Sequence, residues 1–251
     1  MSDVTPTISI DTLTERDIAK AIDHSLLRPE LDDRFVEDGC RLAAEYDVAS
    51  VCVRPADVRR AKAILWDTDV AVGTVIGFPH GNHLTSTKVF EAQQALTDGA
   101  TELDMVIQVG ALKSGRDEDV HADIEAIVEV AHPAGAIVKV IFENAYLTDD
   151  EKIRACRLSE AAGADFVKTS TGFAPGGATH DDLRLMRANT SPRMQVKAAG
   201  GIRTLDALLE VMALGTTRIG ATATKAIIDD FRARKAGGQP VSTGSSPDTG
   251  Y

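Results

Sequence analysis

The chain has 251 residues, of which 43% are hydrophobic and 26% are charged, and its formal net charge is −11 at pH 7. This composition is typical of a globular protein, and the acidic balance argues against a nucleic-acid backbone as the partner. The N-terminal residues contain no apolar signal core and no apolar run reaches membrane-spanning length, so we expect a cytoplasmic protein that binds neither nucleic acid nor membrane.

Short apolar runs alternate with longer amphipathic segments along the chain. The first run, AIDHS at 21–25, is followed by runs at 47–54, 70–78, 99–108, 135–143, 163–170, 194–201 and 216–222. Helical patterns lie between them, for example at 85–99, 117–132 and 147–163, the last opening with a capping box of Thr148 and Glu151. Strands that alternate with helices indicate parallel strands joined by crossovers.

Eight such units in about 250 residues predict a single (β/α)8 barrel, also called a TIM barrel. A doubly wound open sheet is the alternative, although no Gly-x-Gly-x-x-Gly fingerprint follows the first strand. We place the barrel at 16–235, after a lead-in at 1–15. Residues 236–251 are rich in Gly, Ser, Thr and Pro and predict a flexible tail that ends on Tyr251.

Reactive groups of such barrels lie at the C-terminal ends of the strands. The side chains at these ends are Asp23, Cys52, Asp104, Glu143, Lys168 and Lys197. Two neighbouring ammonium groups disfavour each other's charge, so we expect one of the two lysines to keep its proton and to lower the pKa of the other to about 7. A lysine that is partly neutral attacks carbonyls and forms a Schiff base. The alternative is that both lysines pair with acids in structural ion pairs.

The acidic strand ends allow two interpretations each. Asp104 follows Glu102 at a spacing of two, so both side chains are expected to point inward, where Asp104 shuttles protons or is a counter-ion of the lysines. Asp23 binds a substrate hydroxyl or caps the start of a helix. Cys52 lies in the apolar run SVCVRP, where a buried packing cysteine is the default.

Small residues follow the seventh and eighth predicted strands, in AAGGIRT at 198–204 and IGATATK at 219–225. Barrels often bind a phosphate there through backbone N–H groups, and the alternative is a pair of tight turns. His80 and His83 are spaced by three, but no His-Glu-x-x-His motif is present, so we expect no metal site. The three cysteines form no Cys-x-x-Cys pair, which makes a disulfide framework or a zinc knuckle unlikely on spacing alone.

Several motifs resemble those of the deoxyribose-phosphate aldolases. These are ADFVKTSTGF, TELDMVIQVGALKSG, VKAAGGIRT and RIGATAT, together with IDHSLLRPE, VCVRP and GFPHG, and they cover the chain from about Ile18 to Lys225. The resemblance implies a class I aldolase on a (β/α)8 barrel. It also implies reversible cleavage of 2-deoxy-D-ribose 5-phosphate to D-glyceraldehyde 3-phosphate and acetaldehyde, without a metal or other cofactor.

The resemblance also implies a role for individual residues. Lys168 would form the Schiff base, Lys197 would perturb its pKa, and Asp104 would take part in a proton relay. Tyr251 matches a C-terminal tyrosine that often reaches the site in this family, although a disordered end is the other interpretation. Of the phosphosugar and aldehyde substrates, Asp23 and Ser25 would hold the substrate or the relay water, and Cys52 would line the pocket near the bound aldehyde. The phosphate would be bound, largely through backbone groups, by Thr171, Gly172, Gly200, Gly201, Gly220, Ala221 and Thr222.

Three positions depart from common members of this family. Phe173 stands where some members carry a lysine, Ala198 where some have Pro or Ser, and Ser25 in place of a common Thr, which leaves the substrate preference open. The competing hypotheses are a Schiff-base barrel for another sugar or keto-acid phosphate, a non-catalytic phosphosugar-binding barrel, and a phosphate-binding isomerase that uses carboxylates. Barrels of this kind often form homodimers, but no interface can be read from the sequence.

Overall fold

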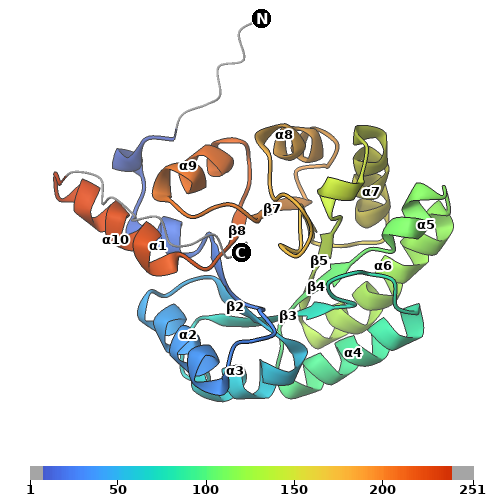
Figure 1. The fold of residues 1–251 in the computed structure, drawn as a ribbon, viewed down its shortest axis with the longest axis horizontal. Coiled ribbons are helices and arrows are strands. Elements are labelled where there is room, and N and C mark those ends of the chain that lie inside the picture. Colours follow the sequence, from blue (N-terminus) through green and yellow to red (C-terminus); the bar gives the residue numbers. More distant parts are fainter. Residues whose placement is uncertain (1–7, 239–251) are drawn as a thin grey trace, which may run out of the picture.

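A computed structural model describes residues 8–238 and contains one closed barrel of eight parallel strands surrounded by helices (Figure 1). The strands follow one another around the barrel in chain order, and β1 pairs with β8 to close it. The predicted (β/α)8 barrel is therefore confirmed, and the open doubly wound sheet is wrong. Tyr251 and most of the predicted tail lie outside the described residues.

The strands and helices alternate over most of the barrel. The strands are β1 (Ile22–Leu26), β2 (Ser50–Val53), β3 (Ala71–Ile76), β4 (Glu102–Val106), β5 (Ile137–Ile141), β6 (Phe166–Lys168), β7 (Gln195–Ala199) and β8 (Arg218–Ala221). The α-helices are α1 (Glu15–Ala19), α2 (Asp33–Glu45), α3 (Val58–Ile64), α4 (Thr85–Asp98), α5 (Val109–Lys113), α6 (Asp117–Ala131), α7 (Asp149–Ala161), α8 (His180–Ala188), α9 (Leu205–Ala213) and α10 (Thr224–Lys235). Short 3₁₀ turns are η1 (Ile10–Thr12), η2 (Pro55–Asp57), η3 (His132–Ala134) and η4 (Asn144–Tyr146).

Local sequence signals explain where several helices begin. The predicted capping box of Thr148 and Glu151 is present at the start of α7, where each side chain accepts a hydrogen bond from the other residue's backbone N–H. Thr179 and Thr204 cap α8 and α9 in the simpler way, by accepting one backbone N–H each. These caps satisfy N–H groups that the helix itself leaves unpaired, and they end the loops that follow β5, β6 and β7.

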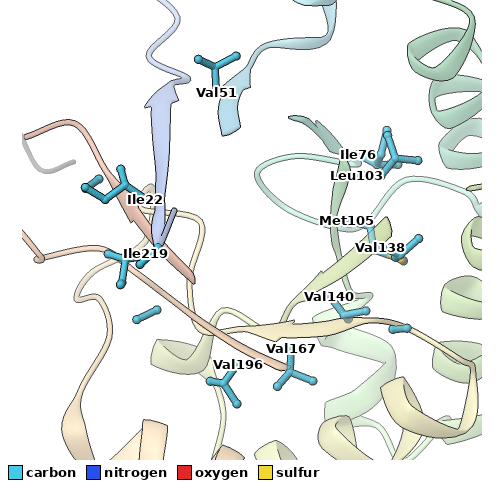
Figure 2. Packing of buried hydrophobic residues seen from close by; sticks show 14 of the residues in the cluster. Ile22, Val51, Ile76, Leu103, Met105, Val138, Val140, Val167, Val196 and Ile219 are labelled. Atoms are coloured by element: carbon cyan, nitrogen blue, oxygen red, sulfur yellow. The ribbon is translucent and has the colours of Figure 1, made fainter. Parts of the chain in front are cut away.

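The core has an apolar outer layer between the strands and the helices. Figure 2 shows part of this layer, formed by residues such as Val138, Val140, Val167, Val196 and Ile219, all of which are buried. Strand side chains alternate between the two faces, so the neighbours of these residues point into the barrel. Branched apolar residues usually fill such an interior. Here the inward positions of β4 to β8 instead carry charged side chains, which marks the interior as unusual.

The loop that follows β3 is fixed by two close approaches of its glycines to neighbouring elements. A Cβ on Gly77 would lie 2.7 Å from Cε of Lys88, and one on Gly81 would lie 1.9 Å from the carbonyl oxygen of Ile107. Both glycines have positive φ, at 62° and 70°. The GFPHG motif at 77–81 therefore encodes a tight loop that presents Phe78 in a fixed position above the barrel.

We expect Gly81→Ala to lower the free energy of unfolding by about 2–4 kcal/mol, because the new methyl group meets a backbone carbonyl and the left-handed conformation is strained. Urea denaturation of the purified variant measures this. Gly135→Ala is the matched control, since Gly135 has a φ of 74° but a Cβ there would have no neighbour within 4 Å. An equal loss in both variants would contradict the assigned role of the Ile107 contact.

Candidate active site

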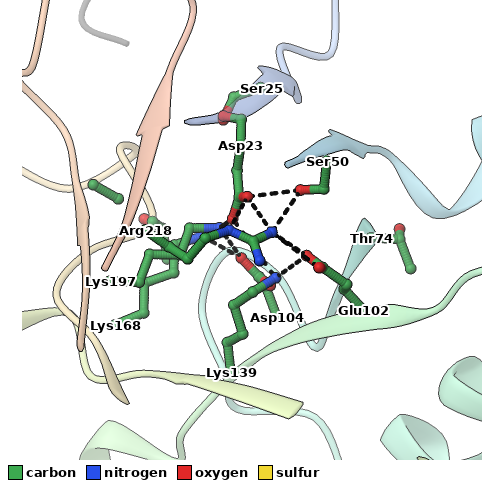
Figure 3. A network of polar contacts seen from close by, with 12 residues as sticks. Asp23, Ser25, Ser50, Thr74, Glu102, Asp104, Lys139, Lys168, Lys197 and Arg218 are labelled. Atoms are coloured by element: carbon green, nitrogen blue, oxygen red, sulfur yellow. Dashed lines mark hydrogen bonds and ion pairs between the residues drawn. The ribbon is translucent and has the colours of Figure 1, made fainter. Parts of the chain in front are cut away.

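A network of seven charged side chains fills the middle of the barrel (Figure 3). Its members are Asp23 from β1, Glu102 and Asp104 from β4, Lys139 from β5, Lys168 from β6, Lys197 from β7 and Arg218 from β8. Arg218 is the most exposed of them, with 13% of its side chain accessible. Burial of isolated charges is costly, so such a cluster is stable only because its members pair with one another.

Asp104 lies at the centre of this network. Its Oδ2 accepts hydrogen bonds from Nζ of Lys168 at 2.8 Å and from Nζ of Lys197 at 2.7 Å, while its Oδ1 accepts from Nζ of Lys139 at 2.8 Å. Burial alone would raise the pKa of Asp104, but the three ammonium groups outweigh it and hold that pKa well below its ordinary value. Asp104 is therefore a carboxylate that touches both of the predicted lysines through one oxygen.

Asp23 and Glu102 complete the pairing on the other side of the barrel. Nζ of Lys197 lies 2.5 Å from Oδ2 of Asp23, and Arg218 donates to both carboxylates. The Oγ of Ser50 also donates to Asp23, at 2.8 Å. Asp23 is part of β1, so the alternative that it caps the start of a helix is wrong.

The network carries more positive than negative charge. Four cations (Lys139, Lys168, Lys197 and Arg218) face three carboxylates (Asp23, Glu102 and Asp104), which leaves a formal excess of 4 − 3 = +1. Lys139, Lys197 and Arg218 each contact at least two carboxylates, whereas Lys168 contacts Asp104 alone, on an oxygen that it shares with Lys197. Lys168 thus has the fewest carboxylate contacts of the four cations in the network, and loss of its proton would remove the excess positive charge.

The expected lowering of the Lys168 pKa is not found in this arrangement. Burial and the charge of Lys139 favour the neutral amine, but the Asp104 carboxylate outweighs them, so the pKa of Lys168 is raised above its ordinary value. The sequence reasoning named Asp104 as a counter-ion of the lysines, but it did not include the effect of this carboxylate on the pKa of Lys168. The ion pairs of the alternative interpretation are present, and they belong to the same cluster as the predicted nucleophile.

Lys139 and Arg218 are two members of the network that sequence reasoning missed. Lys139 stands in the apolar run at 135–143 with valine on either side, so the alternation of strand side chains places it inward with Ile141 and Glu143. Arg218 begins β8 and was not at a strand end. Both cations lie about 6 Å from the centre of the Phe166 ring, which forms an apolar floor beneath them.

One wall beside Lys168 is apolar. Cys52 is buried against Leu27, Val75 and Phe78, and the ring of Phe78 meets that of Phe173 edge-on with centroids 5.2 Å apart. Burial raises the pKa of the Cys52 thiol to about 11 despite the nearby lysines, so the thiol is neutral and acts as a packing group. This agrees with the packing role expected for Cys52, at a position where it also borders the charged network.

The loops after β6 and β7 are in direct contact and form one wall of a cradle. The N–H of Ala178 donates to the carbonyl oxygens of Ala199 and Gly200, and a Cβ on Gly177 would lie 2.5 Å from the Gly200 oxygen. Gly172, Gly200 and Gly201 all have positive φ, between 83° and 90°. Glycine is thus required at positions 177 and 200, because the backbones of the two loops approach each other closely there. The tight turns that were the alternative interpretation of these loops are also present.

The remaining predicted phosphate ligands lie at the ends of β6 and β8. Thr171 is fully buried, Gly220 and Ala221 end β8, and Thr222 follows them. Ser25 is buried in β1, and a Cβ on Gly220 would lie 3.7 Å from its Oγ. Register pairing of β1 with β8 therefore brings Ser25 next to the loop that follows β8.

Glu143 has a strained backbone and a buried carboxylate. Its φ of 56° is rare for a residue with a side chain, and only 3% of the residue is exposed. The carboxylate accepts hydrogen bonds from the Thr171 backbone N–H at 3.2 and 3.3 Å and from the Thr171 hydroxyl. Sequence reasoning noted Glu143 as a strand end but gave it no role, because nothing in the pattern indicated its contact with Thr171.

The histidines of the HGNH motif lie away from this network. His83 lines a surface hollow with Asn82, Leu84, Thr85, Gln108, Asp119 and Ala122. Within residues 8–238, no group of three or more His, Cys, Asp and Glu side chains is arranged to hold a metal ion. In the same part of the chain, no helix combines the length and apolar character needed to span a membrane.

Comparison with known proteins identifies close relatives. Residues 17–230 match the model of the DeoC/LacD family aldolases. A deoxyribose-phosphate aldolase of Rhodopirellula baltica is 48% identical over 234 residues, which cover 92% of this chain and 96% of the relative. One of Thermococcus gammatolerans is 52% identical over 218 residues, covering 86% of this chain and 97% of the relative.

Solved structures show the same architecture. A putative deoxyribose-phosphate aldolase from Coccidioides immitis matches with a TM-score of 0.85 and 41% identity, over 90% of this chain and 88% of that chain. The deoxyribose phosphate aldolase from Aeropyrum pernix, described as a tetramer, matches with a TM-score of 0.83 and 32% identity, over 90% of this chain and 95% of that one.

Proposed function

Since the chain belongs to the DeoC/LacD family of aldolases, we propose that it is a deoxyribose-phosphate aldolase. It is then a class I aldolase, a carbon–carbon lyase that cleaves 2-deoxy-D-ribose 5-phosphate reversibly to D-glyceraldehyde 3-phosphate and acetaldehyde. The observation that carries this proposal is a lysine buried at the end of a barrel strand, with a carboxylate and a second lysine in hydrogen-bond reach.

In the proposed mechanism, Lys168 is the nucleophile. Only a small fraction of Lys168 is neutral, because its pKa is raised and that of Asp104 is lowered. In that fraction the proton has moved to Oδ2 of Asp104, 2.8 Å away, and the free amine attacks C1 of the open-chain sugar. Asp104 returns that proton to the carbinolamine hydroxyl, which leaves as water and gives a protonated imine. The C3 hydroxyl then gives its proton to the Asp104 carboxylate, the C2–C3 bond breaks, and its electrons move into the imine to form an enamine while D-glyceraldehyde 3-phosphate leaves.

The proton relay of the second half uses the same carboxylate. We assign the relay to Asp104 and Lys197, because both contact one another at 2.7 Å and both are within the buried network. Protonation of the enamine at C2 and hydrolysis of the imine release acetaldehyde and restore the Lys168 amine. Lys197 is held by Asp23 as well as Asp104, which keeps it charged next to the nucleophile.

The substrate lies between the apolar wall and the glycine-rich loops in this proposal. Backbone groups of Thr171, Gly172, Gly200 and Gly201, with Gly220, Ala221 and Thr222 after β8, bind the phosphate. Asp23 and Ser25 hold a substrate hydroxyl or a relay water, and Cys52 borders the acetaldehyde end. Tyr251 assists proton transfer at the enamine carbon, a role that rests on the resemblance alone. The chain acts as a homodimer, as barrels of this kind often do, and it acts in the cytoplasm.

Reductive trapping tests the function directly. The protein is incubated with 2-deoxy-D-ribose 5-phosphate or acetaldehyde in the presence of EDTA, reduced with borohydride, and digested for mass spectrometry. We expect a reduced adduct on Lys168, because imine chemistry needs no metal and Lys168 is the least compensated cation of the network. An adduct on Lys197 would reverse the roles of the two lysines, and binding of phosphosugar without any adduct would favour the binding or isomerase hypotheses.

A further inference from the structure

We propose that Glu143 is a positioning residue for the phosphate end of the substrate, acting through Thr171. This proposal rests on the proposed function, since it assigns a role within the same site. Glu143 follows β5 and Thr171 follows β6, so the contact between them joins the loops of two neighbouring strands. It comes in addition to the ordinary strand pairing, which continues here through the N–H of Asn144 and the carbonyl of Thr169 at 3.0 Å.

The free-energy cost of placing Glu143 in this position indicates that its contact with Thr171 is functional. A left-handed conformation at a residue with a side chain is strained, and such strain gathers at functional sites. A buried carboxylate also loses its hydration, and here it recovers hydrogen bonds from two groups of one residue. A glycine at this position would relieve the strain, but it would leave both Thr171 donors without the acceptor that they have in this structure.

The hydrogen bonds of Thr171 also hold the rest of the turn at 171–173 in place. The Thr171 hydroxyl donates to Glu143 and also accepts the backbone N–H of Phe173 at 3.0 Å. Phe173 in turn packs edge-on against Phe78, which the rigid loop 77–81 holds in place. Glu143 therefore fixes one end of the turn at 171–173 and the aromatic pair fixes the other.

This turn leads directly into the cradle. The residues that follow it, at 176–178, are the ones that contact Gly200 and Ala199 at the end of β7. On the other side of Thr171, the hydroxyl of Thr169 donates to the Ala199 carbonyl at 3.2 Å and accepts its N–H at 3.1 Å. A shift of Thr171 would thus move backbone donors of the proposed phosphate site, while the hydrogen bond of Lys168 goes to Asp104 and not to Glu143.

Glu143→Gln tests the proposal, because the amide keeps the size of the side chain but turns one acceptor oxygen into a donor that faces the Thr171 donors. We expect the dissociation constant of glycerol 3-phosphate, measured by titration calorimetry, to rise about tenfold. This ligand has a phosphate but no carbonyl, so the measurement needs no turnover. The KM for 2-deoxy-D-ribose 5-phosphate should rise by a similar factor, with kcat little changed and with the rate of acetaldehyde trapping on Lys168 unchanged.

Glu160→Gln is the matched control. Glu160 lies on α7 and accepts the backbone N–H of Ser191 at 3.2 Å and the Ser191 hydroxyl, which is the same pattern at the opposite end of the barrel. This variant should leave the affinity for glycerol 3-phosphate unchanged. Thr171→Val removes the hydroxyl that donates to Glu143 and should weaken phosphate binding. Thr171→Ser keeps the hydroxyl and should bind phosphate like the wild type.

Three results would overturn the proposal. The first is an unchanged affinity of Glu143→Gln for glycerol 3-phosphate. The second is a tighter affinity, which would mean that the carboxylate competes with the phosphate. The third is slower acetaldehyde trapping together with an unchanged affinity, which would place the action of Glu143 at Lys168. Failure of the wild-type protein to form an adduct on Lys168 would instead contradict the proposed function, and the calorimetric comparison would still decide the role of Glu143.

Discussion

Replacing Lys168 by alanine is expected to lower the rate of cleavage of 2-deoxy-D-ribose 5-phosphate by at least about 10⁴-fold, because removal of a nucleophile that forms a covalent intermediate removes the whole reaction path. A coupled enzyme assay of D-glyceraldehyde 3-phosphate release, combined with borohydride trapping of the same preparation, measures this. No adduct should form on any lysine of the variant.

Lys168 is suited to be the nucleophile because its charge is neutralised by fewer carboxylates than that of Lys139 or Lys197. Lys139 and Lys197 each contact two or three carboxylates, so the loss of either would remove two or three ion pairs. Loss of Lys168 instead removes the excess positive charge of the network. We therefore expect Lys168→Ala to fold with little loss of stability, so that its inactivity reflects chemistry.

Lys152→Ala is the matched control for this experiment. Lys152 lies on α7, contacts Asp182 at 2.6 Å and Asp149 at 3.1 Å, and is remote from the network in the barrel. This variant should retain wild-type turnover and wild-type trapping on Lys168. Near-normal aldolase activity in Lys168→Ala would disprove the assignment of the nucleophile.

Asp104→Asn is expected to have the second largest effect, on both stability and activity. The substitution leaves three buried ammonium groups without the carboxylate that they share, and breaking a buried ion pair by removing one partner costs about 3–5 kcal/mol. The rate of cleavage should fall by about 10³-fold, because the proposed acceptor of the Lys168 proton is lost. Urea denaturation and turnover per folded molecule separate the two effects.

The buried pair of Lys88 and Asp123 between α4 and α6 supplies the control for Asp104→Asn. Both side chains are fully buried and 2.5 Å apart, so Asp123→Asn also breaks a buried ion pair. It should lower stability while the activity of the folded fraction stays near that of the wild type. An Asp104→Asn variant that loses stability but keeps its turnover would show that Asp104 is a counter-ion and no proton acceptor.

The pH dependence of stability follows from the lowered pKa of Asp104. A carboxyl group whose pKa is lower in the folded state stabilises the fold above its unfolded pKa of about 3.9, and this contribution is lost as the pH falls further toward the folded pKa. The wild-type protein should therefore lose stability as the pH falls below about 4, and Asp104→Asn should lose less over the same range.

The fold was predictable because it depends on a pattern that repeats along the whole chain. Eight apolar runs separated by amphipathic segments predict the eight strands, and each run contains the strand that the structure has at that place, with β1 extending one residue further, to Leu26. The alternation of side chains along a strand then predicts that Lys168, Lys197 and Asp104 point toward the same interior.

Contacts between strands were harder to predict, since they depend on the register of the barrel. Arg218 and Asp23 are 195 residues apart and meet only because β8 pairs with β1. The direction of the Lys168 pKa was wrong for a similar reason, because the pattern indicates that Asp104 points inward but not that one of its oxygens lies within 2.8 Å of both lysines. The contact of Glu143 with Thr171 depends on a single backbone conformation that no pattern indicates.

The pairing of Arg218 with Asp23 and Glu102 has a consequence for how the protein is made. Arg218 is on the last strand, so a nascent chain on the ribosome contains both acids long before this cation. Lys139 and Lys197 are made earlier, but until β8 arrives each carboxylate lacks the partner that Arg218 provides, and water has to take its place. The same charges that serve the reaction therefore make closure of the barrel depend on nearly complete synthesis.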